Sequence, residues 1–464
     1  MPGLAAYRTR LEALLSETAA AHGVPGAVCG VLLEGDTAIA AHGVANIATG
    51  VEVTPDTLFQ IGSITKLYTT TLVLQAHAAG LLALDEPVRA QLQEFSVADP
   101  GATLEITPRH LLTHTSGIAG DHLLDTGSNP DALLHYVATL AGLGQVHAPD
   151  EAYSFCNTGF GVVGRLIEVV CGENFDQALR RRLLRPLGCS ATLTLPQHLL
   201  LRRTAAGHIQ VPGGEPSRQP RWTLTRANGP MGGIVCTAAD LLAFARMHIE
   251  SGQGSDRHEV LPAAAVELMT ESQIETPIPG EEQALGWSRR HWGDEVCLGQ
   301  DADTFGQRAF LRVVPACGFA LTVQANSPLG AALARDLVAQ VAADLLDVRA
   351  EEPLRVPASE GSTDGPAAGA VDPAPLVGTY DRLHQRVVVA EVDGGLTLTT
   401  EPSGVLAALG ARRAVAALRP VDVDRGVFVL TDPASGTDQA AVFGQGHDQA
   451  PSLHVDGRVH RRLS

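Results

Sequence analysis

The chain has 464 residues, of which 45% are hydrophobic and 18% charged. This balance excludes a disordered protein and predicts a globular one, and the length predicts about two or three domains. The net charge of −18 argues against nucleic acids and anionic membranes as general partners, because phosphate binding needs basic patches. No apolar run is long enough to span a membrane, and the N-terminal segment does not resemble a signal peptide. Seven widely spaced cysteines favour reduced thiols in a cytoplasm.

In chain order, an amphipathic pattern over residues 4–22 predicts a helix that ends at Gly23. Residues 27–46 predict two strands that turn over 34–36. Helical patterns dominate the middle of the chain, over 63–79, 131–142, 159–171 and 239–252. Residues 308–326 then predict another hairpin, turning over 315–318, and a helix follows over 329–346. Strands from both ends around a helix-rich middle predict an α+β domain with one shared sheet and a helical region beside it.

A change of composition separates this domain, residues 1–350, from the rest. Residues 351–374 are rich in Pro, Gly, Ala and acidic residues without periodicity, which is typical of a linker. Residues 375–464 contain several strand-like stretches, and Asp393-Gly394-Gly395 between two of them is a hairpin signal. We therefore expect a small antiparallel β domain at the C-terminus. The sequence leaves open whether it covers a functional site or packs behind it.

The basic residues are unevenly divided, because Lys66 is the only lysine among 33 and the other 32 are arginines. Lys66 is either a chance survivor on a solvated face or a residue that arginine cannot replace. Lysine can become a neutral amine and act as a base, whereas arginine stays protonated. Ser63 precedes Lys66 by three residues, so a helix that starts near Ser63 would place both side chains on one face. A desolvated lysine there could activate the serine as a nucleophile, and the helix N-terminus could stabilise negative charge on the reacting carbonyl.

The Ser-x-x-Lys pattern is common by itself, but the surrounding sequence is more specific. TPDTLFQIGSITKLYTT, ITPRHLLTHTSGI, SFCNTGFGVVGRLIE and GPMGGIVCTAADLLAFARMH follow in this order. The chain, over roughly residues 5 to 345, resembles the serine β-lactamase and penicillin-binding-protein-like hydrolases, nearest the class C β-lactamase, esterase and D-aminopeptidase branch. The resemblance implies a β-lactamase-like transpeptidase fold without a cofactor, with Ser63 as the acylated nucleophile and Lys66 as its base.

The C-terminal segment carries a resemblance of its own. LVGTY at its start and LHVDGRVHRR at its end are similar to the lipocalin-like β domain that follows some of these hydrolases. Related chains include thioesterases that release and cyclise nonribosomal peptides. The resemblance therefore implies a barrel-like domain and a place in secondary metabolism.

The second motif of the family, Tyr-x-Asn, is altered. Alignment on Asn157 places Phe155 where the family has a tyrosine that assists proton transfer, and phenylalanine has no hydroxyl group. Tyr153 would point to the same side of an extended chain, at roughly 6–7 Å along the strand. Tyr153 either substitutes for the missing hydroxyl or, as we favour, is a packed aromatic residue with a paired hydroxyl. Asn157 is expected to orient groups around the pocket.

The third motif, Lys-Thr-Gly or His-x-Gly, is also altered. Gln300 stands at the position of the cation or histidine, and Ala302 at that of the glycine. Gln300 either hydrogen-bonds a substrate carboxylate or amide, or is an ordinary polar residue at a strand end. The backbone N–H near Asp303 is expected to serve with that of Ser63 as the oxyanion donors.

Other motifs favour structural interpretations. The G-x-G-x-x-G pattern over 159–164 lacks a βαβ context and indicates close helix packing rather than a dinucleotide site. His110 and His114 are four residues apart without an obvious third metal ligand, so we expect structural histidines. Cys156 is expected to be a buried small residue rather than a reactive thiol. The arginine run over 180–185 is expected to form a solvated helix face.

The sequence therefore predicts a serine acyl-transfer enzyme. It would form an acyl-Ser63 intermediate from an ester, thioester or amide, a small molecule or a peptide, and pass the acyl group to water or an amine. Loss of one general acid or base typically costs about 100- to 10,000-fold in rate. The altered motifs thus leave an alternative, a catalytically impaired binding protein on a β-lactamase-like scaffold. Hydrolysis and transfer to an amine are not separated by the sequence.

Overall fold

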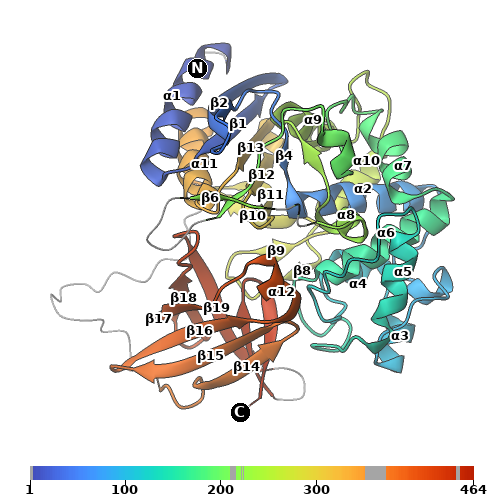
Figure 1. Ribbon diagram of the computed structural model, residues 1–464. Coiled ribbons are helices and arrows are strands. Elements are labelled where there is room, and N and C mark those ends of the chain that lie inside the picture. The colour runs from blue at the N-terminus through green and yellow to red at the C-terminus, as the bar shows by residue number, and fades with distance from the viewer. Residues whose placement is uncertain are drawn as a thin grey trace.

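The computed structural model describes residues 4–209, 216–220, 222, 224–350, 372–445 and 450–463, which form a large mixed domain and a β-barrel (Figure 1). The helices are α1 (Leu4–His22), α2 (Thr65–Ala78), α3 (Pro100–Glu105), α4 (Pro108–Leu112), α5 (Ala132–Ala138), α6 (Asn157–Cys171), α7 (Phe175–Leu179), α8 (Gly229–Gly232), α9 (Ala238–Ile249), α10 (Ala263–Thr270), α11 (Gly330–Leu346) and α12 (Gly404–Leu409). Within these described residues, no helix is both long and apolar enough to cross a membrane.

The strands of the large domain are β1 (Gly26–Leu33), β2 (Asp36–Asn46), β3 (Val51–Glu52), β4 (Phe59–Gln60), β5 (His208–Ile209), β6 (Ser217–Arg218), β7 (Val235–Cys236), β8 (Ile274–Glu275), β9 (Glu282–Gln283), β10 (Ser288–Trp292), β11 (Glu295–Asp303), β12 (Arg308–Val314) and β13 (Phe319–Ala325). Those of the barrel are β14 (Gly378–Arg382), β15 (Gln385–Val392), β16 (Gly395–Pro402), β17 (Ala414–Asp422), β18 (Val427–Thr431), β19 (Asp438–Gln445), β20 (Pro451–Val455) and β21 (Arg458–Arg462).

The main sheet joins the two ends of the large domain, as the sequence predicts. Its nine strands run β3-β2-β1-β13-β12-β11-β10-β9-β8, and β1 pairs antiparallel with β13, Ala27 opposite Ala325. The hairpins around 34–36 and 315–318 are confirmed. Glu34 has φ 49° and Gly35 φ 94°, the positive values that a tight hairpin turn requires.

Both faces of the main sheet are buried, and alternate residues of its central strands serve opposite cores. Phe319, Leu321 and Val323 of β13 pack with α1 and α11. Leu311 and Val313 of β12 belong to the larger core on the other face, together with helices of the middle segment. Figure 1 shows α1 and α11 on one side of the sheet, with α2, α6 and α9 on the other. The main sheet is thus fixed by a hydrophobic core on each of its two faces.

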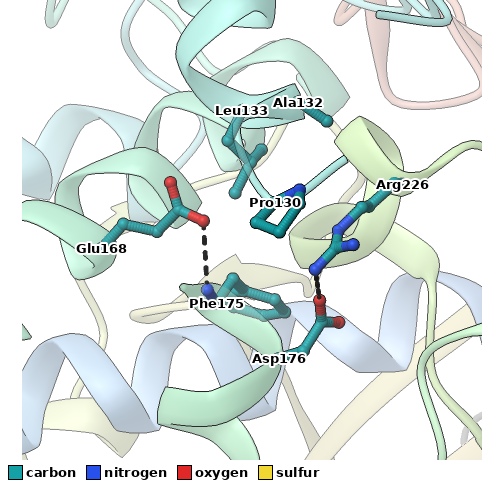
Figure 2. A pocket seen from close by; sticks show the side chains of 7 residues that line it. All are labelled: Pro130, Ala132, Leu133, Glu168, Phe175, Asp176 and Arg226. Atoms are coloured by element: carbon teal, nitrogen blue, oxygen red, sulfur yellow. Dashed lines mark hydrogen bonds and ion pairs between the residues drawn. The ribbon is translucent and has the colours of Figure 1, made fainter. Parts of the chain in front are cut away.

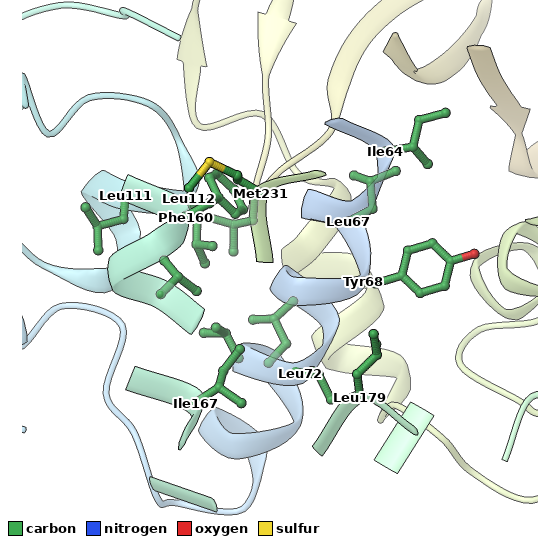
Figure 3. Packing of buried hydrophobic residues seen from close by; sticks show 14 of the residues in the cluster. Ile64, Leu67, Tyr68, Leu72, Leu111, Leu112, Phe160, Ile167, Leu179 and Met231 are labelled. Carbon is green, nitrogen blue, oxygen red and sulfur yellow. The ribbon is translucent and has the colours of Figure 1, made fainter. Parts of the chain in front are cut away.

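Helix α2 lies inside this larger core rather than on its surface. Thr65 to Leu74 are all buried, and Leu67, Tyr68 and Leu72 pack among side chains of neighbouring helices (Figure 3). The helix is surrounded on all sides, so its polar residues Thr65, Thr69, Thr70 and Thr71 are buried together with the apolar ones. Any polar side chain on its first turns is therefore removed from water, and this determines the environment of Lys66.

The C-terminal domain is a closed antiparallel barrel of eight strands, β14 to β21 in order, and β14 closes on β21 with Tyr380 opposite Arg462. Tyr380, Val387, Leu398 and Phe428 fill its interior. Closure pairs the strand edges that an open sheet would expose. The β15–β16 turn at Asp393-Gly394 is confirmed.

Three details differ from the sequence-based expectation or fall outside it. The helix predicted to start near Ser63 is confirmed, but α2 begins at Thr65, and Ser63 lies in the 3₁₀ turn (Gly62–Ile64) that leads into it. The sequence patterns missed β17, which lacks an alternation of apolar and polar residues, and α12, whose six residues are too few for a helical pattern. The predicted linker over 351–374 lies, up to residue 371, outside the described residues.

Candidate active site

Ser63 is held by a tight turn against the main sheet. The preceding Gly62 has φ 44°, and a Cβ at this residue would lie 2.7 Å from Thr304 Cγ2 and 3.0 Å from Ala302 Cβ. Only glycine fits both the left-handed backbone and this close approach. Ser63 remains partly exposed while its neighbours are buried. The turn therefore presents a serine hydroxyl to solvent on an otherwise rigid element.

Lys66 lies one turn later and is fully buried. Its Nζ is 2.9 Å from Ser63 Oγ and donates to the Met231 carbonyl oxygen at 2.9 Å. Burial, reinforced by the positive charge of Arg458 and opposed by Asp121, lowers the pKa of Lys66 to about 7. A neutral amine can donate to Met231 and keep its lone pair for the Ser63 proton. The geometry thus suits a serine–lysine pair at neutral pH.

Phe155, not Tyr153, occupies the place beside Lys66. Lys66 Nζ lies 4.7 Å from the centre of the Phe155 ring and 5.5 Å from that of Phe160. Tyr153 is 8% exposed and packs edge-on against His114, with ring centres 5.9 Å apart. Burial holds the pKa of the Tyr153 hydroxyl well above its usual range. This arrangement favours the packed-aromatic interpretation of Tyr153.

Asn157, the first residue of α6, points to a buried carboxylate. Its Nδ2 donates to Asp121 Oδ1 at 2.6 Å. Asp121 is also paired with two arginines of the barrel, Arg382 at 2.8 Å and Arg458 at 2.9 Å. Burial alone would raise the pKa of Asp121, but the two arginines and the Asn157 amide hold it well below its usual range. Asn157 therefore orients Asp121, and Asp121 connects the two domains.

The end of β11 forms the opposite wall, where the sequence places the third motif. Ala302 is buried against Gly62, and Gln300 shares its face of the strand by alternation. The Gln300 amide donates to the Asp301 carbonyl oxygen at 3.2 Å. The Asp303 side chain is exposed and pairs with Arg308 at 2.9 Å, while its backbone lies against Gly62. The structure thus brings this strand to the Ser63 turn, and the oxyanion role of the Asp303 amide remains a prediction.

The structural interpretations of the other motifs agree with the contacts. His110 accepts from the Thr107 amide in a helix cap, and His114 accepts from the Cys156 amide at 3.0 Å. Burial raises the pKa of the Cys156 thiol to about 11, which keeps it protonated. All seven cysteines are free. In the part of the chain that the structure describes, no group of three or more His, Cys, Asp or Glu side chains could hold a metal ion.

The G-x-G-x-x-G pattern lies inside α6 and permits close packing. A Cβ at Gly161 would lie 2.4 Å from the Tyr136 ring, and one at Gly164 would lie 2.1 Å from Pro230 Cγ. The predicted arginine face differs in detail, because residues 180–184 form a π-helical turn and two of the arginines bind the Glu173 carboxylate.

A small cavity beside α6 is separate from this site. Its volume is about 10 Å³, near the lower limit for one water molecule. Figure 2 shows that its polar groups already satisfy one another, since Glu168 accepts from the Phe175 amide and Arg226 pairs with Asp176. None of the predicted site residues lines it.

Sequence reasoning missed four residues at the site: the Met231 carbonyl, Asp121, Arg382 and Arg458. Met231 and Arg458 lie in stretches that carry the family resemblance, but no spacing pattern links them to Lys66. Asp121 has only the positive φ of 64° as a local peculiarity, which a sequence does not display. Contacts between positions hundreds of residues apart are visible only in the folded chain.

A sheet built from both chain ends, a buried helix with a serine one turn before a lysine, and a helical region beside them define a β-lactamase-like serine acyl-transfer fold. The family model described as Beta-lactamase matches residues 11–344, so the chain belongs to this family. Penicillin-binding protein 4 of Amycolatopsis lactamdurans is 39% identical over 381 residues, covering 81% of this chain and 97% of the relative. The acyltransferase calJ of Penicillium decumbens is 29% identical over 263 residues, covering 49% of this chain and 60% of the relative. Among solved structures, SurE with D-Leu superposes with a TM-score of 0.76 at 29% identity, covering 99% of this chain and 100% of SurE.

Proposed function

We propose that the protein is a serine acyl-transfer enzyme that passes an acyl group from an ester, thioester or amide through Ser63 to an amine or to water. The observation that carries this proposal is the distance of 2.9 Å between Ser63 Oγ and Lys66 Nζ, in an environment that lowers the pKa of Lys66 to about 7. A buried amine that is half neutral at physiological pH is costly to maintain and suits a general base.

The reaction begins when Ser63 Oγ attacks the acyl carbonyl and its proton moves to Lys66 Nζ. The Ser63 and Asp303 amides hold the oxyanion, and the leaving alcohol, thiol or amine takes the proton from Lys66. An incoming amine or water then attacks the acyl-Ser63 ester and gives its proton to Lys66 Nζ. Ser63 Oγ takes this proton from Lys66 as its bond to the acyl group breaks, which releases the product and restores the enzyme. Because Phe155 has no hydroxyl, Lys66 performs the proton transfers that the family shares between two groups.

Transfer to an amine is the branch we favour, with a peptide or amino-acid group as substrate. Without a tyrosine beside it, attack by water on acyl-Ser63 is slowed, while a good amine nucleophile still reacts. The relatedness to an acyltransferase and to SurE, whose structure contains D-Leu, supports this class of substrate. As part of this proposal, the protein is a biosynthetic thioesterase or transacylase of secondary metabolism.

Intact-mass spectrometry after incubation with activated acyl esters and acyl thioesters tests the proposal. The wild-type protein should gain the mass of one acyl group, and Ser63→Ala should gain none. Addition of amine acceptors should yield an amide product faster than the free acid. Equal labelling of the wild-type protein and Ser63→Ala would contradict the proposal. Formation of the free acid alone, at full rate, would contradict transfer to an amine.

The second candidate, a binding protein on the same scaffold, is favoured by Phe155 and Gln300 in place of the motif residues. It predicts no mass gain with any donor but saturable, reversible binding of the same compounds by calorimetry. The variant Phe155→Tyr distinguishes a slow enzyme from a protein that has lost catalysis. In a slow enzyme, the restored hydroxyl should shorten the acyl-enzyme lifetime about tenfold or more.

A further inference from the structure

The hairpin between β20 and β21 places the barrel directly against the candidate site. The Phe155 amide donates to the Gly457 carbonyl oxygen at 2.9 Å, and the Val459 amide donates to Ser154 Oγ at 3.2 Å. These bonds lie on both sides of Arg458 and fix the hairpin to the segment that carries Phe155. The barrel therefore forms part of the wall of the site rather than packing behind it.

Arg458 makes two contacts that lead to Lys66. Its guanidinium lies 4.7 Å from the centre of the Phe155 ring, the same ring that Lys66 Nζ approaches at 4.7 Å. It also pairs with Asp121, and its side chain is only 14% exposed. A guanidinium in this position both packs the ring and balances the buried carboxylate.

The charged groups that face Lys66 are few. Among the described residues, Cys156 and His114 are buried beside it, and burial raises the pKa of the thiol and lowers that of the imidazole, so both are neutral at pH 7. The two remaining charges are Asp121 and Arg458, and they act on the Lys66 ammonium in opposite directions. Asp121 alone would favour the protonated amine, which cannot act as a base.

We propose that Arg458 of the barrel is a positioning residue for acyl transfer: it packs Phe155 and offsets Asp121, so that Lys66 stays available as a base. The catalytic pair is thus completed by the C-terminal domain, about 390 residues away in sequence. The role of Lys66 as a base rests on the proposed function, whereas the effect of Arg458 on the protonation of Lys66 does not.

The sole lysine makes a direct test possible. Protein labelled with ¹³C at lysine Cε gives one lysine resonance, provided that no purification tag adds another lysine, and its pH titration reports the pKa of Lys66. Wild-type protein should titrate near pH 7. In Arg458→Gln the midpoint should rise by about one pH unit. Lys66 Nζ and the Arg458 guanidinium each lie 4.7 Å from the Phe155 ring centre, so they are at most about 9 Å apart, and a unit charge within that distance shifts a pKa by about one unit. Arg458→Lys keeps the charge but adds a second lysine, so its spectrum is compared with that of the double variant that also carries Lys66→Met.

Arg382→Gln is the matched control. It removes the other arginine that pairs with Asp121, and the Arg382 guanidinium also contacts Gln385 and His460 within the barrel. The Lys66 midpoint should move less in this variant than in Arg458→Gln, because the groups that act on the charge of Lys66 are Arg458, Asp121 and Cys156. The acid limb of acylation, followed by mass spectrometry, should shift with the midpoint in Arg458→Gln and return toward wild type in Arg458→Lys.

An unchanged midpoint in Arg458→Gln, or an equal shift in Arg382→Gln, would overturn the inference, because the effect would then be absent or a general loosening of the barrel. A shifted midpoint in a protein that never acquires an acyl group would support the role of Arg458 and reject the proposed function. The two can therefore fail independently.

Discussion

Replacing Lys66 with methionine should stabilise the protein while it abolishes acylation. Lys66 is fully buried, and its pKa falls from the usual 10.5 to about 7. A shift of this size corresponds to about 5 kcal/mol of unfavourable interaction for the protonated amine in the folded state. Methionine has a similar length and no charge, so it removes this cost and fills the same space.

The gain in folding stability is reduced because methionine cannot make the hydrogen bonds of Lys66. The buried Met231 carbonyl oxygen loses its partner, which costs about 1–3 kcal/mol, and Ser63 retains access to water. The net expectation for Lys66→Met at pH 7 is a free energy of unfolding higher by about 2–4 kcal/mol than that of the wild type.

The pH dependence follows from the sign of the shift. Between pH 7 and 10.5 the unfolded wild-type chain binds a proton that the folded chain lacks, so wild-type stability rises with pH by about 1.4 kcal/mol per unit. Below pH 7 both states are protonated at this site and the full cost applies. The advantage of the methionine variant should therefore shrink from pH 7 to about zero, or reverse, near pH 9.5.

Urea unfolding followed by tryptophan fluorescence measures this difference. All three tryptophans, Trp222, Trp287 and Trp292, belong to the large domain, so the signal reports on the domain that contains Lys66. Ser63→Ala serves as the control, because it keeps the amine and should keep the wild-type slope with pH. A methionine variant less stable than wild type at pH 7, or a difference that does not change with pH, would refute the reasoning.

Three further outcomes are expected. Asp121→Asn leaves the two barrel arginines without their carboxylate and should cost about 3–5 kcal/mol, seen as earlier unfolding and faster proteolysis between the domains. Gly164→Ala brings a methyl group against Pro230 and should cost about 1–3 kcal/mol in urea unfolding, whereas Gly142→Ala, with open space around it, should be nearly neutral; equal effects would contradict the packing argument. Cys156, with a pKa of about 11, should resist iodoacetamide at pH 8 in the folded protein and react once the chain is unfolded; labelling at equal rates in both states would be inconsistent with its burial.

Much of the fold was predictable because local signals agree with the final structure. The amphipathic pattern over 4–22 gives α1 with the expected ends, and the Glu34-Gly35 and Pro315–Gly318 turns fix two hairpins. The barrel strand β17 was missed because its exposed residues Val415 and Ala417 are as apolar as its inward Ala416, so the sequence shows no apolar–polar alternation although the burial alternates. Ser63 lies before α2 and not within it, since the close contact of Gly62 with β11 tightens the turn.

The sequence by itself determined the chemical core of the site. A serine three residues before the only lysine can form a proton-transfer pair on local geometry alone, and their family context identifies the fold. The tertiary structure decided how that pair is tuned. The pKa of Lys66 depends on burial of α2 within a core assembled from distant segments, and on Asp121 and Arg458, which come from different domains. Electrostatic interactions act through space and depend on burial, so no local pattern in the chain records them.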